Sequence, residues 1–178
     1  MIALLESRRI VLFLAALVIA LAACSPSPSQ PAEVLPTLSP VDIADLDVVI
    51  GQTVFVPAYS AIFFGDADRL LPLTATLAIH NTDPQNPIIV KSVRYYDTDG
   101  NLAREFIDSP VLLNPLATTG FVVATDELET GWGTNFLVEW VAETPAFEPV
   151  IEAIMVSNRG TEGVSFVSSG RIVSEQRP

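Results

Sequence analysis

The sequence has one cysteine, Cys24, and one histidine, His80, in 178 residues. A single cysteine excludes an intrachain disulfide, and one histidine without further cysteines leaves no ligand set for a zinc site. Basic residues are also few: nine lysines and arginines stand against 21 aspartates and glutamates, which gives a formal charge of −12. A chain this acidic is repelled by phosphate backbones. We therefore expect no nucleic-acid partner, no metal and no cofactor.

Long apolar runs are absent as well, and the longest one lies at the amino terminus. Arg8 and Arg9 precede the unbroken apolar run Ile10–Ala23. This run has 14 residues, which is short of the roughly 20 that a membrane-spanning helix needs. A positive start, a short apolar core and small residues at its end are typical of a secretory signal peptide. We predict that residues 1–23 form one.

The end of this segment, Leu21-Ala22-Ala23-Cys24, resembles the lipobox of bacterial lipoproteins. That resemblance implies cleavage before Cys24, lipidation of its sulfur and a place in the cell envelope, at the outer membrane where a cell has two. Two or more acyl chains hold a protein on a membrane stably, whereas one does so only marginally. The membrane is therefore one expected partner. Ser7-Arg8-Arg9 also partly resembles a twin-arginine export signal, so the export route stays open.

A tether is expected to follow the lipidated cysteine, over residues 24–44. Ser25–Pro40 contains five prolines in 16 residues and no apolar periodicity. Such a stretch favours an extended chain of about 3.1 Å per residue. Residues 45–178 are then enough for one domain and too few for two ordinary ones.

Short strands are the expected elements of residues 45–178. Apolar and polar residues alternate in Leu73–His80 and in Phe136–Val141, as they do in strands with one buried face. Further candidate strands are Val48–Val56, Ile88–Tyr96, Leu102–Ile107, Thr118–Ala124, Val150–Val156 and a strand through Val164 and Phe166. This number and spacing predict an all-β fold, an immunoglobulin-like two-sheet β-sandwich.

Three local patterns refine this fold. Lys91 shares a face with buried positions of Ile88–Tyr96, so a β-bulge is expected there. Asp97–Asn101 carries an Asp-Gly turn and predicts a hairpin; its acidic residues only superficially resemble a calcium loop, which requires a closing glutamate and flanking helices. Pro110–Pro115 looks like the stretch that crosses between sheets in many bacterial immunoglobulin-like domains.

Five segments together resemble the bacterial lipoproteins grouped as domain of unknown function 3124. They are GQTVFVPAYS (51–60), IHNTDPQNPI (79–88), VRYYDTDGN (93–101), NFLVEW (135–140) and GVSFVSSGRIV (163–173). The resemblance runs from Val49 to Val173 and supports location and fold without implying a mechanism. Ala61 departs from the family, where a histidine is expected, so any site that used that histidine is impaired here.

Acid–base catalysis has weak candidates. Glu139, Glu143 and Glu148 could pair as in glycosidases, but strand alternation places Glu139 outward, and a solvated acidic face is the favoured interpretation. His80 is expected on the exposed face of its strand, and no Gly-x-Ser-x-Gly motif accompanies it. An envelope hydrolase using outward carboxylates is therefore the alternative hypothesis only.

A possible partner-binding loop is the most unusual local feature. Tyr59–Asp66 holds several large apolar residues that do not alternate, and Tyr59, Phe63, Phe64 and Asp66 are the candidate contacts. The same residues could instead cap the core, and Trp132, between two glycines, presents the same choice between contact and plug. We expect a non-enzymatic binding or assembly module whose unknown partner is an envelope protein or a glycan.

Overall fold

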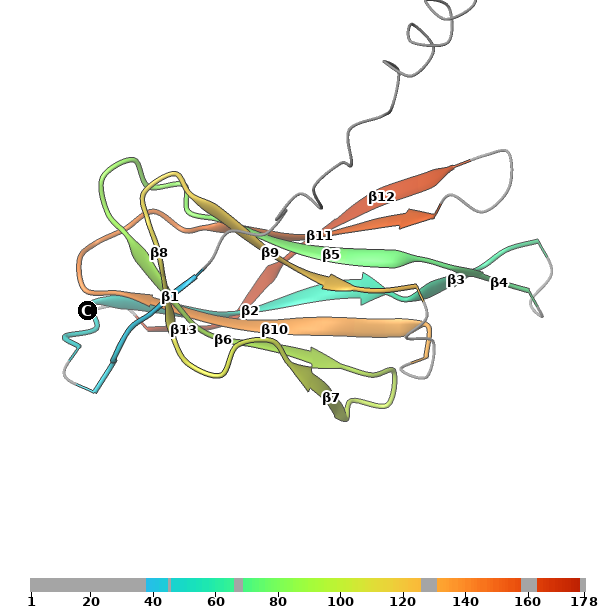
Figure 1. Ribbon diagram of the computed structural model, residues 1–178, viewed down its shortest axis with the longest axis horizontal. Coiled ribbons are helices and arrows are strands. Elements are labelled where there is room, and N and C mark those ends of the chain that lie inside the picture. Colours follow the sequence, from blue (N-terminus) through green and yellow to red (C-terminus); the bar gives the residue numbers. More distant parts are fainter. Residues whose placement is uncertain (1–37, 45, 66–68, 126–130, 158–162, 177–178) are drawn as a thin grey trace, which may run out of the picture. The chain divides into compact units, whose positions relative to one another are not determined.

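The computed structural model describes residues 38–44, 46–65, 69–125, 131–157 and 163–176, and every element in them is a strand (Figure 1). The strands, in chain order, are β1 (Ser39–Pro40), β2 (Ile50–Tyr59), β3 (Ala61–Phe63), β4 (Leu70–Pro72), β5 (Thr74–His80), β6 (Ile88–Tyr96), β7 (Leu102–Glu105), β8 (Val111–Leu113), β9 (Thr118–Val123), β10 (Gly133–Ala142), β11 (Val150–Ser157), β12 (Val164–Ser169) and β13 (Arg171–Gln176).

Two sheets contain most of these strands. The larger sheet has the order β1-β8-β6-β10-β2-β13, with β7 beside β6, and the smaller sheet has the order β12-β11-β5-β9. β3 and β4 pair only with each other, as a short hairpin. One core cluster draws its side chains from both sheets. The predicted all-β sandwich is therefore confirmed.

The core follows the alternation of the sequence. Leu77 and Ile79 of the smaller sheet are fully buried, as are Phe136, Val138 and Trp140 of the larger one. Each such side chain contributes about 1.5–3 kcal/mol through burial. The buried faces predicted from period-two alternation are confirmed in one strand of each sheet.

The irregularity expected in β6 is also present. The pairing of β6 with β10 shifts register between Glu139 and Trp140, whose partners are Ser92 and Val90. Lys91 is the extra residue between those partners. It leaves the inward face to Val90 and Val93, which are buried, so the predicted bulge is confirmed.

The two predicted connections are confirmed too. β6 and β7 pair as an antiparallel hairpin around Gly100, whose φ of 83° suits a tight turn. β8 lies in the larger sheet and β9 in the smaller one, so the chain crosses between sheets after the Pro110–Pro115 stretch. Leu116 makes that crossing with a left-handed φ of 57°.

The alternation rule missed β13, because all six of its residues are exposed. The chain passes from β12 to β13 at Gly170 and there changes sheets. A Cβ on Gly170 would lie 2.6 Å from Val54 Cγ1 and 2.8 Å from the Ile151 carbonyl oxygen. Only glycine fits this crossing.

At the amino-terminal side, pairing begins earlier than the predicted domain start at 45. β1 pairs with β8 through Ser39 and Leu112, so the last residues of the predicted tether join the larger sheet. The predicted signal peptide and Cys24 lie outside the described residues. In the described ranges, no helix is long and apolar enough to cross a membrane.

Candidate functional site

The β3–β4 hairpin lies at one end of the sandwich (Figure 1) and connects a core strand of the larger sheet to one of the smaller sheet. β2 of the larger sheet leads into β3 through Ser60, and β4 leads through Leu73 into β5 of the smaller sheet. The Leu73 N–H donates to the Ser60 carbonyl at 2.8 Å. Ala61 and Leu73 are buried, so the base of the hairpin is fixed by both sheets.

Aromatic rings from distant parts of the chain meet beside this hairpin. Trp132 stacks on Tyr59, with centroids 6.1 Å apart, and Phe63 lies 5.6 Å from Trp132 in a tilted arrangement. The ring centroids of Phe166, in β12, and Tyr59 lie 6.0 Å apart. We call Tyr59, Phe63, Phe64, Trp132 and Phe166 the aromatic end.

Much of the aromatic end is exposed. Phe63 is 53% exposed, Phe64 58% and Trp132 44%. The Arg69 guanidinium lies 5.8 Å from the Phe64 centroid, within the range of a cation–π contact. Phe63 and Phe64 are thus exposed side chains and do not cap the core, whereas Asp66 lies outside the described residues.

Trp132 is held in place by the residues on both sides of it. The Ser60 hydroxyl donates to the Gly131 carbonyl, and the Gly133 N–H donates to Thr98 Oγ1 at 3.0 Å. Gly131 has a φ of 81° and lies against Thr98, which leaves no room for a Cβ. The sequence showed the Gly-Trp-Gly pattern but gave no sign that it meets Tyr59 and Phe63.

The other end of β5 has the opposite chemistry. Asn81 is buried, and its Nδ2 donates to the carbonyls of Asn86, Leu113 and Asn114 at 2.9–3.2 Å. Its Oδ1 accepts the Asp83 N–H at 3.0 Å. We call Asn81, Asp83 and Asn86 the polar end; it ties the loop after β5 to the crossing before β9.

Asp83 is the electrostatic centre of the polar end. Its carboxylate is buried and accepts the N–H groups of Gln85, Asn86 and Phe147 at 2.8–3.0 Å. These hydrogen bonds, that from Gln85 first, lower the pKa of Asp83 from its usual 3.8 to about 2. These hydrogen bonds join the loop after β5 to the segment before β11 that contains Phe147.

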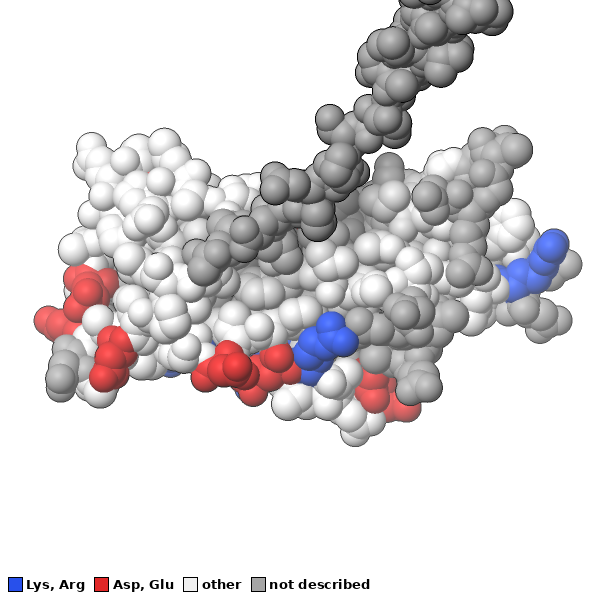
Figure 2. Space-filling view, viewed as in Figure 1, with Lys and Arg blue, Asp and Glu red and all other residues white. Residues whose placement is uncertain are grey.

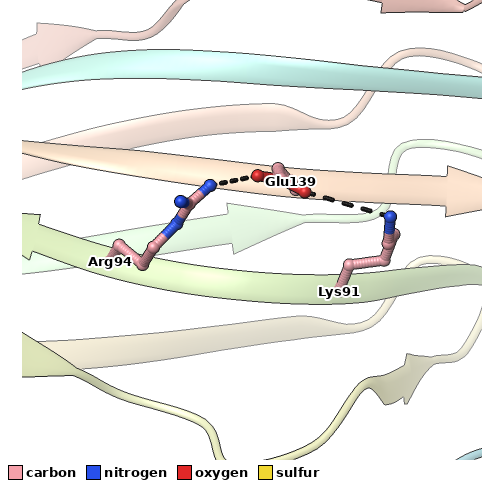
Figure 3. Close-up of polar contacts among 3 residues, drawn as sticks. All are labelled: Lys91, Arg94 and Glu139. Carbon is pink, nitrogen blue, oxygen red and sulfur yellow. Dashed lines mark hydrogen bonds and ion pairs between the residues drawn. The ribbon is translucent and has the colours of Figure 1, made fainter.

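The predicted carboxylates have separate partners. Figure 3 shows Arg94 and Lys91 of β6 reaching the two oxygens of Glu139 on β10; Lys91 Nζ is 3.9 Å away. Glu148 instead accepts from Gln52 Nε2 at 3.0 Å, as Glu175 does at 2.8 Å.

The sequence did not indicate that Glu148 and Glu175 share one hydrogen-bond donor, because the two residues lie far apart in the chain. Gln52 Oε1 in turn accepts the indole N–H of Trp140 at 3.2 Å. Gln52 therefore links the buried tryptophan to both carboxylates.

A shallow depression beside Glu139 has a volume of about 80 Å³, well below the 300–1,000 Å³ typical of small-molecule sites.

The remaining predicted candidates serve local structure. Asp97 accepts the N–H groups of Asp99 and Asn101 at 2.9 and 2.7 Å, and the Asn101 side chain above all lowers its pKa. His80 Nδ1 lies 2.9 Å from Thr118 Oγ1. In the described ranges no three His, Cys, Asp or Glu residues are grouped to hold a metal ion.

Charge is distributed unevenly over the sandwich. In the view of Figure 2 the acidic side chains lie along the lower and left margins, and the upper part of the described surface is largely white. The strands of the smaller sheet, β12, β11, β5 and β9, lie in the upper part of Figure 1, together with β8 of the larger sheet. Glu152 is the one charged residue in its four strands.

Residues 51–173 match the family described as protein of unknown function (DUF3124). The chain belongs to this family. The resemblance predicted from five segments is confirmed, and the whole aromatic end lies inside the DUF3124 match.

Comparison with curated proteins gives no match. Among solved structures, the crystal structure of Thermotoga maritima 1070 is similar, with 13% identity and a TM-score of 0.37. The alignment covers 67% of the DUF3124 chain described here and 92% of the Thermotoga maritima chain.

Proposed function

We propose that this DUF3124 protein is a lipid-anchored lipoprotein of the cell envelope that binds a partner, without catalysis, through its aromatic end. The observation that carries the proposal is the joint exposure of Phe63 and Phe64, at the β3–β4 hairpin, and of Trp132, which lies just before β10 and packs against Phe63. The partner is an envelope protein or a glycan. The amino-terminal signals seen in the sequence support the anchoring half of the proposal.

Two physical features favour binding at this place. Phenylalanine, tyrosine and tryptophan bury large areas on association and dominate the energy of many interfaces. The rings are also pre-arranged, since Ser60 and Thr98 hold the segment around Trp132. A partner then meets a surface that loses little conformational entropy on binding.

The hydrolase alternative has less support. Glu139 is engaged by Arg94 and Lys91, and Glu148 is engaged by Gln52. A general acid and base must share one site within reach of a single bond. If the binding proposal holds, Glu139→Gln and Glu148→Gln leave partner capture unchanged.

The binding half can be tested by photo-crosslinking in cells that carry the full chain. A photoreactive amino acid replaces Phe63 in one variant and Phe147 in the other. Phe147 is a matched control, because it is a phenylalanine that is 64% exposed but lies at the polar end, where its N–H donates to Asp83. We expect a defined product from position 63 only. The same products from both positions, or none from position 63, would refute the binding site.

The anchoring half has an independent test. Mass spectrometry of the amino-terminal peptide from the native host should show a diacylglyceryl group on Cys24. Cys24→Ala should accumulate the uncleaved precursor. An unmodified Cys24 peptide would refute the anchor and leave the aromatic-end proposal standing.

A further inference from the structure

The sandwich protects its sheet edges unequally. The larger sheet ends in β13 on one side, and on the other in β1, which is two residues long and contains Pro40, and in β7, which is four residues long and carries Arg104 and Glu105. β13 carries Arg171 and Glu175, and its pairing with β2 shifts register between Ile172 and Ser174. Short length, proline, charge and irregular register all hinder the addition of another strand. Both edges of the larger sheet are therefore blunted.

β12 has none of these protections. Val164–Ser169 contains no charge and no proline, and it pairs with β11 over six residues without a register shift. Among the described residues, β11 is its one strand partner. Alternate N–H and C=O groups of β12 therefore point away from the sheet, as at any free edge.

β12 is also less well covered than β9, the other edge strand of the smaller sheet. The inward residues of β9, Thr119, Phe121 and Val123, are buried. Those of β12, Phe166 among them, are only half-buried. On the outward face of β12, Val167 is 54% exposed. A further strand beside β12 would place side chains next to Phe166 on the inner face and next to Val167 on the outer face. The inward side chains of β9 are already buried without such a strand.

We infer that a second copy of this chain pairs its β12 with β12 of the first, so that the two smaller sheets become one continuous sheet. The charge distribution makes this edge the place where a second copy meets least repulsion. Each chain has a formal charge of −12, so two copies repel wherever acidic surfaces meet. Glu152 is the one charged residue in the strands of the smaller sheet, and β12 itself has none.

The sequence of β12 complements itself in this arrangement. Two identical antiparallel strands related by a two-fold axis place residues of the same face opposite one another. The axis therefore passes beside one residue, Phe166 or Val167, and that residue opposes its own copy. With the axis at Phe166, two half-buried rings meet on the inner face, next to Tyr59 of each copy. Aromatic pairs of this kind stabilise antiparallel strands.

Cysteine crosslinking of the full chain in its native cells tests this inference. Val167→Cys lies at the proposed axis or one residue from it, on the exposed face of β12, and is treated with a membrane-permeable bismaleimide. Val122→Cys is the matched control, since Val122 is a 41% exposed valine on β9, at the other edge of the same sheet. The unaltered chain, whose one cysteine is Cys24, gives the background.

We expect a covalent dimer from Val167→Cys and only background from Val122→Cys. Adding Ser165→Glu to Val167→Cys puts a carboxylate from each copy at the shared edge and should abolish the dimer, whereas the neutral Ser165→Gln should retain it. Equal dimer from both cysteine variants, persistence with Ser165→Glu, no dimer, or a product with a different protein would each overturn the inference. The dimer is recognised as a product of two copies of this chain, whereas the crosslinks expected at position 63 join this chain to a different partner.

Discussion

The two ends of β5 solve different physical problems. At the polar end, side chains that would be costly to bury are buried, and the donors and acceptors of Asn81 and Asp83 are bonded within their own loop and to neighbouring segments of the fold. At the aromatic end, side chains that would gain from burial are left exposed, as Phe63 and Phe64 are. The polar end thus stabilises the fold, whereas the exposed apolar area of the aromatic end remains available for contact with another molecule.

The two tryptophans give the largest expected contrast. Trp140 is fully buried next to Gln52, and Trp140→Ala should lower the free energy of unfolding by about 3–5 kcal/mol, through lost burial and a cavity. Trp132→Ala is the matched control at the aromatic end and should cost far less, since that ring is half-exposed. Urea denaturation measures both. Equal losses would end the distinction between the two ends.

Asn81 should give the next largest effect. Asn81→Ala leaves the carbonyls of Asn86, Leu113 and Asn114 without their shared donor. A buried unpaired polar group costs about 1–3 kcal/mol, so we expect a loss of about 3 kcal/mol in urea denaturation. Asn114→Ala is the control, because that side chain is exposed. A cost for Asn81→Ala as small as that of the control would mean that water replaces the side chain freely.

Acid should weaken the polar end through Asp83. Its pKa is about 2 when folded against a usual 3.8, so the folded state favours the ionised form. The contribution to stability is therefore complete above about pH 4 and is lost as the pH falls from about 4 to about 2. Asp83→Asn should flatten the pH dependence of unfolding in that range, although Asp97, whose pKa is also lowered, retains part of it. An unchanged slope would contradict the assignment.

The sequence predicted the middle of the sandwich better than its ends. Alternation located Leu77 and Trp140 correctly because one face of each strand is buried. It could not locate β13, whose residues are all exposed. The bulge at Lys91 was predictable, because a charged side chain at an inward position demands one.

Contacts between distant segments were beyond sequence reasoning. Tyr59 and Phe63 stood out as aromatic residues in a loop, but Phe166 joins them only because β12 runs beside the end of β2. Glu175 reaches Gln52 only because β13 pairs with β2. A single sequence shows period and turn chemistry, whereas such meetings depend on the order of strands in the sheets.

The smallest expected effect on stability is at Phe63 and Phe64, and it is the most informative. Both are more than half exposed, so Phe63→Ser and Phe64→Ser should each leave the free energy of unfolding within about 0.5 kcal/mol of the parent, as for most surface changes. Urea denaturation measures this. Leu77→Ser, at a fully buried position, is the control that must show a loss of several kcal/mol.

The same two variants should lose partner capture in cells, since each removes an aromatic anchor without disturbing the fold. That combination, unchanged unfolding with lost binding, is what separates a binding surface from packing. A large stability loss at both positions would show that the aromatic end completes the core in solution, and its exposed rings would then no longer mark a site. Unchanged unfolding with unchanged capture would place the contact elsewhere on the domain.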